Sequence, residues 1–299
     1  MNLDSIGKEL TNWDAEAEVQ VCRWADVTTL GVGLGRFYRV APHSICDLKN
    51  ILQYINNKQV NSIVIGAGSN LVGSDEDYDG VVLDLRKCCG EIRQDGAVFT
   101  VGSAVPLLRL VKFAAEQGYG GISKLCGIPG QLGGVVTMNA GALGQEICTS
   151  VLELRGMLAG QEWSWQPTMS DWGYRHCKLP VGVVLTEIVL KLIEVIPEEE
   201  NALIFAELHR RADVTPKGRS AGSVFRNPPG QFAGSLLEQC GCKGLSIGNL
   251  HVSVQHANWI VKEGNEPGLA ADCRSLVEEM RRRVLEQFGV LLETEWRWV

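Results

Sequence analysis

The segment from residue 127 to residue 144 constrains this chain more than any other, because glycine recurs throughout it. Glycine has no Cβ, so the backbone there can approach a ligand closely and present bare N–H groups. Pro129 also fixes one φ angle inside the segment. The pattern predicts a site for an extended, buried diphosphate, and a crowded packing turn is the alternative. The glycines are Gly127, Gly130, Gly133, Gly134, Gly141 and Gly144.

Two shorter glycine clusters precede this segment, at residues 31–35 and 66–70. A Rossmann dinucleotide site needs a strand before its glycines, a helix after them and an acid about 20 residues further on. A strand-like segment follows the first cluster, and a turn-like stretch at 73–80 follows the second. Neither cluster is therefore a Rossmann motif. The second still predicts a strand-to-loop turn that either holds a pyrophosphate through its amides or is simply tight.

Hydrophobic periodicity predicts a mixed α+β chain. An acidic, polar stretch at 197–201 predicts a domain boundary. We expect one region over 1–196, made of two α/β subdomains split near residue 57, and a second domain over 197–299. Strands are expected at 36–40, 62–65, 81–85, 151–157, 183–192 and 290–299, and helices at 45–55, 107–117 and 269–288, the last one capped by Gly289.

Composition excludes several classes of function. The net charge is −7 and no run of Lys or Arg occurs, so neither nucleic-acid binding nor membrane-surface binding is expected. No apolar run reaches the ~20 residues of a membrane helix. Residues 1–14 lack the pattern of a signal peptide, which predicts a cytoplasmic protein. Ten cysteines without a CxxC pair predict small buried side chains, with no disulfide and no metal site.

Eight short motifs resemble the UDP-N-acetylenolpyruvoylglucosamine reductase (MurB) family, in its shorter, type II-like variety. They follow the family's order from about residue 28 to the C-terminus. The segments lie at 28–29, 66–71, 127–130, 138–141, 174–175, 221–228, 256–258 and 295–297.

The resemblance implies an FAD-binding domain of the vanillyl-alcohol oxidase/PCMH type followed by an α+β MurB-type substrate domain. It implies non-covalent FAD held by three glycine-containing segments. The implied cofactor-binding residues are Gly66, Ala67, Gly68, Ser69, Asn70, Gly127, Ile128, Pro129, Gly130, Gly133, Gly134, Asn139, Ala140 and Gly141.

The same resemblance implies a reaction and its partners. NADPH reduces the flavin, hydride then reaches C3 of the enolpyruvyl ether of a UDP-sugar, and protonation of C2 gives UDP-N-acetylmuramate, a peptidoglycan precursor. We expect a monomer that binds no nucleic acid and does not insert into a membrane. Two rival functions are another flavin oxidoreductase of the same FAD fold and a non-catalytic nucleotide-sugar-binding homologue.

This chemistry needs a group that stabilises an enolate and a group that protonates C2. The family motifs imply Arg175 and Glu295 for the first task and Ser223 as the proton donor. An arginine fork suits a carboxylate or enolate oxygen. The ordinary alternatives are a salt bridge for Arg175, a turn or cap for Ser223 and a solvated strand face for Glu295. The implied substrate-binding residues are Tyr174, Arg226, Asn227 and Asn258.

The chain departs from the family pattern at residues 29–34, at 121–123 and at Cys177, where the family commonly has serine. These departures touch flavin contacts and pocket details, and none of them falls on the three implied catalytic residues. Cys177 is expected to be a plain substitution rather than an acid, a base or a redox group. For the nearby Lys217 and Arg219, solvated charges are the default expectation.

Overall fold

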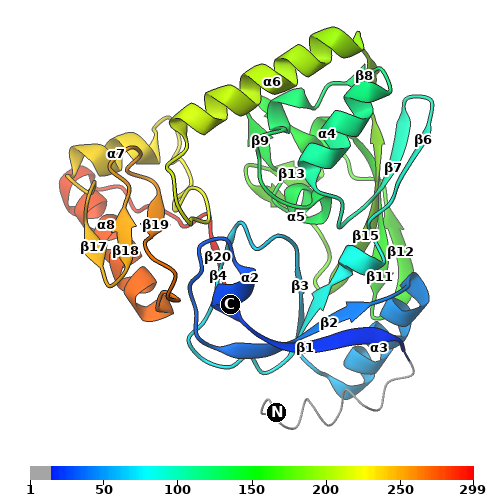
Figure 1. The fold of residues 1–299 in the computed structure, drawn as a ribbon, viewed down its shortest axis with the longest axis horizontal. Coiled ribbons are helices and arrows are strands. Elements are labelled where there is room, and N and C mark those ends of the chain that lie inside the picture. Colours follow the sequence, from blue (N-terminus) through cyan, green and yellow to red (C-terminus); the bar gives the residue numbers. More distant parts are fainter. Residues whose placement is uncertain (1–14) are drawn as a thin grey trace. The chain divides into compact units, whose positions relative to one another are not determined.

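A computed structural model describes residues 15–299, so the expectation about a signal peptide lies outside the described residues. The chain forms two compact units (Figure 1). Among the described residues, unit 1 contains 15–20, 38–66 and 80–212, and unit 2 contains 21–37, 67–79 and 213–299. This division differs from the predicted boundary after residue 196, because the chain enters unit 2 three times.

The first sheet has the strand order β1-β2-β5-β3, and β5 pairs in parallel with both β2 and β3. Helix α3 (Ile45–Lys58) follows β2 and buries one face. Ser44 caps that helix by accepting a hydrogen bond from the Asp47 amide at 3.1 Å. The strands are β1 (Ala17–Arg23), β2 (Arg36–Pro42), β3 (Ser62–Ile65) and β5 (Val81–Asp84).

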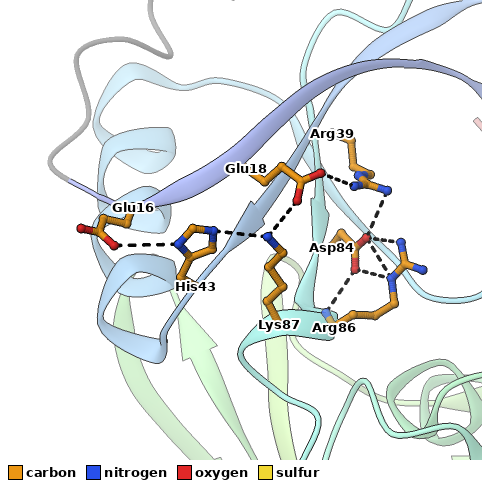
Figure 2. A network of polar contacts seen from close by, with 7 residues as sticks. All are labelled: Glu16, Glu18, Arg39, His43, Asp84, Arg86 and Lys87. Carbon is orange, nitrogen blue, oxygen red and sulfur yellow. Dashed lines mark hydrogen bonds and ion pairs between the residues drawn. The ribbon is translucent and has the colours of Figure 1, made fainter.

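A polar network lies at one end of this sheet (Figure 2). Asp84, the last residue of β5, accepts hydrogen bonds from the guanidinium of Arg86. Glu18 joins Arg39 at 3.1 Å and Lys87 at 2.8 Å. Burial alone would raise the pKa of Asp84, but the bonds from Arg86 outweigh burial and leave that pKa lowered. The charges of this network neutralise one another. We therefore interpret it as a structural network that holds the strands of this sheet together.

The second sheet of unit 1 is antiparallel and has the order β12-β11-β15-β7-β6. Helices α4 (Leu107–Glu116) and α5 (Leu132–Thr137) pack their apolar residues into one core with it. The strands are β6 (Ile92–Asp95), β7 (Val98–Gly102), β11 (Val151–Leu158), β12 (Gln161–Trp165) and β15 (Val183–Lys191).

Short elements complete unit 1. They are the strands β8 (Tyr119–Gly120), β9 (Gly141–Ala142), β10 (Gln145–Glu146), β13 (Trp172–Gly173), β14 (His176–Cys177) and β16 (Ile193–Glu194), and the 3-10 turns η1 (Leu85–Lys87), η2 (Ser123–Leu125), η3 (Ile147–Ser150) and η4 (Met169–Asp171).

The acidic stretch at 197–201 is not a break in the chain. It is the first turn of α6 (Pro197–Val214), where Glu198, Glu199 and Glu200 lie near the positive end of the helix dipole. The stretch that was expected to mark a domain boundary is therefore regular helix. The helix also carries the chain past the predicted boundary, because unit 1 ends at Ala212.

Unit 2 builds its core between α8 (Ala270–Phe288) and the antiparallel sheet β17-β18-β19. Asp75 caps α8 from a distant segment, since its carboxylate accepts hydrogen bonds from the amides of Ala270 and Ala271 at 2.9 and 3.0 Å. Gly289 ends the helix with φ 68°, as predicted. The other elements are α2 (Trp24–Val27), β4 (Leu71–Val72), α7 (Ala233–Gln239), β17 (Ser246–Ile247), β18 (Leu250–Val252), β19 (Ile260–Lys262) and β20 (Arg297–Trp298).

The predicted C-terminal strand is only partly regular. Leu292 and Trp296 are buried on one side, as the alternating pattern predicts. The segment forms one short strand, β20, which runs parallel to β4, and Thr294 makes an isolated antiparallel bridge with Phe225. Across residues 15–299, no helix combines the length and the hydropathy needed to cross a membrane.

Candidate active site

The glycine segment of unit 1 divides into a packed part and an open part. A Cβ on Gly127 would collide with Cδ of Arg211, so this glycine makes room for an arginine side chain. A Cβ on Gly134, in α5, would meet no heavy atom within 4 Å. The packing-turn interpretation therefore suits Gly127, and the ligand interpretation suits Gly134, where the backbone is open.

Several amides that were expected to face a diphosphate already have protein acceptors. The Gly133 amide donates to the Ser103 carbonyl at 2.8 Å, and the Ile128 amide donates to the Leu125 carbonyl at 2.9 Å. The Asn139 and Ala140 amides donate to carbonyls near the end of α5, those of Val136 and Val135, at 2.9 and 2.8 Å. The hydrogen bonds of these amides fix the conformation of the segment. At Gly134, in contrast, the space beside the backbone is empty.

Arg211 is a residue that the sequence analysis did not single out. It lies in the last turn of α6, with its aliphatic stem across Gly127. Burial lowers the pKa of Arg211, the Glu207 carboxylate raises it, and the nearby positive charge of Arg175 lowers it further. Unit 1 thus holds two guanidinium groups close to the glycine segment. In the sequence, the adjacent arginines at 210 and 211 are the pattern that could have pointed to Arg211.

Arg175 lies at the tip of a tight hairpin. Trp172 pairs with Cys177 and Gly173 pairs with His176, which leaves residues 174–175 as a two-residue loop. Arg175 has φ 58°, in the left-handed region that disfavours side chains with a Cβ. Its guanidinium lies over the Tyr174 ring, with Cζ 5.1 Å from the ring centroid. Burial raises the pKa of the neighbouring Cys177 thiol to about 12, so this cysteine stays neutral, which fits its expected passive role.

Ser223 and Glu295 come from adjacent backbone segments of unit 2. The Glu295 amide donates to the Val224 carbonyl at 2.8 Å, directly beside Ser223 in the chain. The Asn70 side chain donates to the Glu295 carbonyl at 3.1 Å. The backbone carbonyl of Asn70 accepts from the Arg297 amide at 3.0 Å. Asn70 thus ties the end of the 66–70 turn to the C-terminal segment that carries Glu295.

A second tie joins the same turn to the segment that precedes Ser223. The Thr29 amide donates to the Gly68 carbonyl at 3.1 Å, and the Thr29 hydroxyl donates to the Ser220 carbonyl at 2.7 Å. Arg219 donates to the carbonyls of Thr28 at 2.9 Å and Ala25 at 3.1 Å. Arg219 is exposed, as expected for a solvated charge, and its guanidinium also donates to these backbone carbonyls.

The residues implied in substrate binding differ in how free their side chains are. Both polar atoms of the Asn258 side chain bond to the backbone of Phe225, at 2.9 and 2.8 Å, and only 3% of Asn258 is exposed. The Asn227 side-chain oxygen accepts from the Ala233 amide at 3.0 Å. Within residues 15–299, Nε of Arg226 is buried and has no hydrogen-bond partner, an arrangement that fits an anionic ligand.

Comparisons with known proteins find relatives over most of the chain. A family described as FAD binding domain matches residues 38–163, and one described as UDP-N-acetylenolpyruvoylglucosamine reductase, C-terminal domain, matches 214–299. The reductase of Azorhizobium caulinodans is 35% identical over 91% of this chain and 88% of its own length. The crystal structure of the reductase (MurB) from Thermus caldophilus is 35% identical, with a TM-score of 0.80 over 95% of this chain and 99% of its own.

The chain belongs to the UDP-N-acetylenolpyruvoylglucosamine reductase family. The reductase of Methylococcus capsulatus agrees, at 36% identity over 88% of this chain and 86% of its own length. The predicted resemblance and the predicted α+β fold class, an FAD-binding domain followed by a MurB-type C-terminal domain, are both confirmed. The C-terminal match begins at 214, one residue after unit 2 resumes, whereas the division at 196/197 into cofactor and substrate domains stays a prediction.

Proposed function

We propose that this chain reduces UDP-N-acetylenolpyruvoylglucosamine to UDP-N-acetylmuramate with electrons from NADPH, through non-covalent FAD, as a cytoplasmic monomer in peptidoglycan precursor synthesis. Family membership supports the activity. The observation that supports the site assignment is the hydrogen bond from the Glu295 amide to the Val224 carbonyl, because it joins the segment of the implied acid to the segment of the implied proton donor, Ser223.

The residues present fit an FAD molecule. Gly134 offers open backbone, and the Asn70 and Thr29 hydrogen bonds hold the 66–70 turn in a defined shape. When bound, FAD would accept a hydride from NADPH and pass it to C3 of the enolpyruvyl group. We propose that the 66–70 turn and the open part of the 127–134 segment hold this cofactor.

The protein's own residues handle the charge and the proton. Arg175 would bind the substrate carboxylate and stabilise the enolate oxygen that forms beside it, because a guanidinium offers two parallel donors. Ser223 would deliver a proton to C2. A free serine hydroxyl is a weak acid, so the reaction needs a polarising neighbour, and the adjacent Glu295 is our candidate for that task.

The implied substrate-binding residues differ in whether their polar side-chain atoms are already bonded to the protein. Tyr174 and Arg226 would contact the substrate, and the unpartnered Nε of Arg226 suits one of its anionic groups. Asn227 accepts from Ala233 through its side-chain oxygen, so its NH₂ group is the donor that would reach the substrate. Asn258 would act indirectly, because its side chain holds the Phe225 backbone two residues from Ser223.

The variant Ser223→Ala tests the mechanism. NADPH should still bleach the flavin, while reoxidation by the enolpyruvyl substrate should slow by roughly 10²–10⁴-fold, because only the second half-reaction needs the C2 proton. Anaerobic stopped-flow absorbance measures the two steps separately. Ser246→Ala, on an exposed residue of β17, is the matched control and should leave both steps unchanged.

Three other experimental results would each contradict a different part of the proposed function. Fast reoxidation in Ser223→Ala would remove Ser223 as the donor. Purified wild-type protein without bound flavin would favour a non-catalytic nucleotide-sugar-binding homologue. Hydrogen peroxide as the product, without UDP-N-acetylmuramate, would favour an oxidase on the same FAD fold.

A further inference from the structure

Asn139 is fully buried and uses its entire side chain on the protein. Its exposed fraction is 0% and its φ is 39°. The Nδ2 atom donates to Oε2 of Glu146 at 3.0 Å and to the Gly173 carbonyl at 3.1 Å, and Oδ1 accepts from the Cys148 amide at 3.3 Å. The amide orientation is unambiguous, because flipping it would turn an oxygen toward two acceptors and an NH₂ toward a donor.

One of these contacts reaches the hairpin that carries Arg175. Gly173, the acceptor from Asn139, is the last residue of β13 and precedes the two-residue tip. On the other side of the tip, the Arg175 guanidinium donates to the Gly141 carbonyl at 3.4 Å, two residues beyond Asn139. The 139–141 segment therefore contacts both the base of the hairpin and the side chain at its tip.

The conformation of Arg175 needs such support. A non-glycine residue at φ 58° persists only where the surrounding structure holds it there. Asn139 supplies this hold from one side, and Glu146 keeps the Asn139 amide oriented. The Asn139 backbone amide is committed as well, to the Val136 carbonyl. Its side chain and amide thus serve the hairpin and α5 rather than a diphosphate.

We propose that Asn139, oriented by Glu146, is a positioning residue that holds the Gly173 side of the hairpin and so presents the Arg175 guanidinium to the substrate carboxylate. The inference rests on the proposed function for the role of Arg175. It assigns Asn139 a different task from the cofactor contact that the sequence motif implies.

A double-mutant cycle tests the proposal. Asn139→Ala should leave flavin reduction by NADPH unchanged and slow reoxidation by the enolpyruvyl substrate by roughly 10–100-fold, the scale of a small displacement of a catalytic group. In the Arg175→Ala background the same change should cost less than about twofold, because the residue it positions is gone. Asn201→Ala is the matched control, because Asn201 is exposed and its side-chain amide bonds to the Pro197 carbonyl within α6.

A second measurement needs neither cofactor nor turnover. Hydrogen exchange of the peptide that spans 172–177, followed by mass spectrometry in the apo chain, should accelerate at least about 10-fold in Asn139→Ala and stay unchanged in Asn201→Ala. Should Asn139→Ala fail to fold, Glu146→Gln takes its place in both experiments. It keeps an acceptor for Asn139 but removes the charge, so we expect smaller effects in the same direction.

The outcomes separate the two proposals. Additive effects in the double-mutant cycle, or unchanged exchange at 172–177, would overturn the positioning role. A wild-type chain that does not turn over the UDP-sugar would overturn the proposed function instead, and the exchange measurement would still test whether Asn139 holds the hairpin.

Discussion

At the scale of single residues, the left-handed backbone of Arg175 gives a stability prediction. A Cβ at φ 58° costs about 1 kcal/mol relative to glycine. We therefore expect Arg175→Gly to have a free energy of unfolding about 1 kcal/mol above that of Arg175→Ala, although both lose flavin reoxidation. Urea denaturation of the apo variants measures the difference.

Arg155 offers the matched control for this prediction, because it lies in strand β11, where glycine is the weaker residue. Arg155→Gly should therefore be less stable than Arg155→Ala. If glycine were also the less stable substitution at 175, the strained tip of the hairpin would not exist in solution.

Residue roles could be predicted from sequence only where a motif names the residue. Ser223 and Glu295 were selected this way, and the structure pairs their segments. The tasks of Asn139 and Asn258 could not be foreseen, because their partners are fixed by tertiary contacts. Asn258 bonds to the backbone of Phe225, 33 positions away in the chain, and no periodic pattern in the sequence predicts such a bond. The backbone acceptors of the exposed Arg219 could not be foreseen for the same reason, since they lie about 190 residues earlier.

At the scale of elements, helix α5 gives a prediction that separates stability from cofactor binding. Alanine at Gly134 should stabilise the apo chain by about 1 kcal/mol, because alanine is the better helix former and its Cβ meets no neighbour within 4 Å. The same methyl group would occupy the open backbone proposed for FAD, so FAD affinity should fall. Thermal unfolding of the apo protein and a flavin titration measure the two effects.

Gly127→Ala is the contrasting variant, because its Cβ would collide with Arg211. We expect it to lower the stability of the apo chain. Equal FAD affinity in wild type and Gly134→Ala would exclude α5 from the cofactor site, whereas a stable Gly127→Ala would show that the Arg211 stem moves without cost.

Helices and strands with a strong hydrophobic pattern were predicted with bounds close to those of the structure. Those without such a pattern were missed or predicted too long. The 3.6-residue repeat that stops at Gly289 predicted the helix that forms α8, and a β-branched run predicted β3. Helix α6 was missed because its apolar residues do not gather on one buried face: Leu203 and Phe205 are exposed, while Ile204 and Glu207 are buried. The C-terminal segment alternates like a strand, yet it forms only the short strand β20 against the two residues of β4 and an isolated antiparallel bridge between Thr294 and Phe225.

At the scale of the whole molecule, unit 2 is assembled from three stretches of the chain. Leu30, Val32 and Val72 from the two earlier stretches lie in the same core as α8. Asp75 caps that helix, and β4 pairs with β20. A sequence boundary cannot reveal such an arrangement, because composition changes along the chain while cores form between distant parts of it.

The interleaved core predicts that residues 197–299 will not fold alone. The fragment would lack the apolar side chains of the two earlier stretches, the cap on α8 and the only strand that pairs with β20 among residues 15–299. We expect no cooperative unfolding transition by circular dichroism and little amide protection in α8. A chain that joins 21–37, 67–79 and 213–299 through Gly/Ser linkers should regain both. If the fragment itself unfolded cooperatively with α8 protected as in the full chain, the earlier stretches would be dispensable, and the boundary near 197 would describe an independent domain.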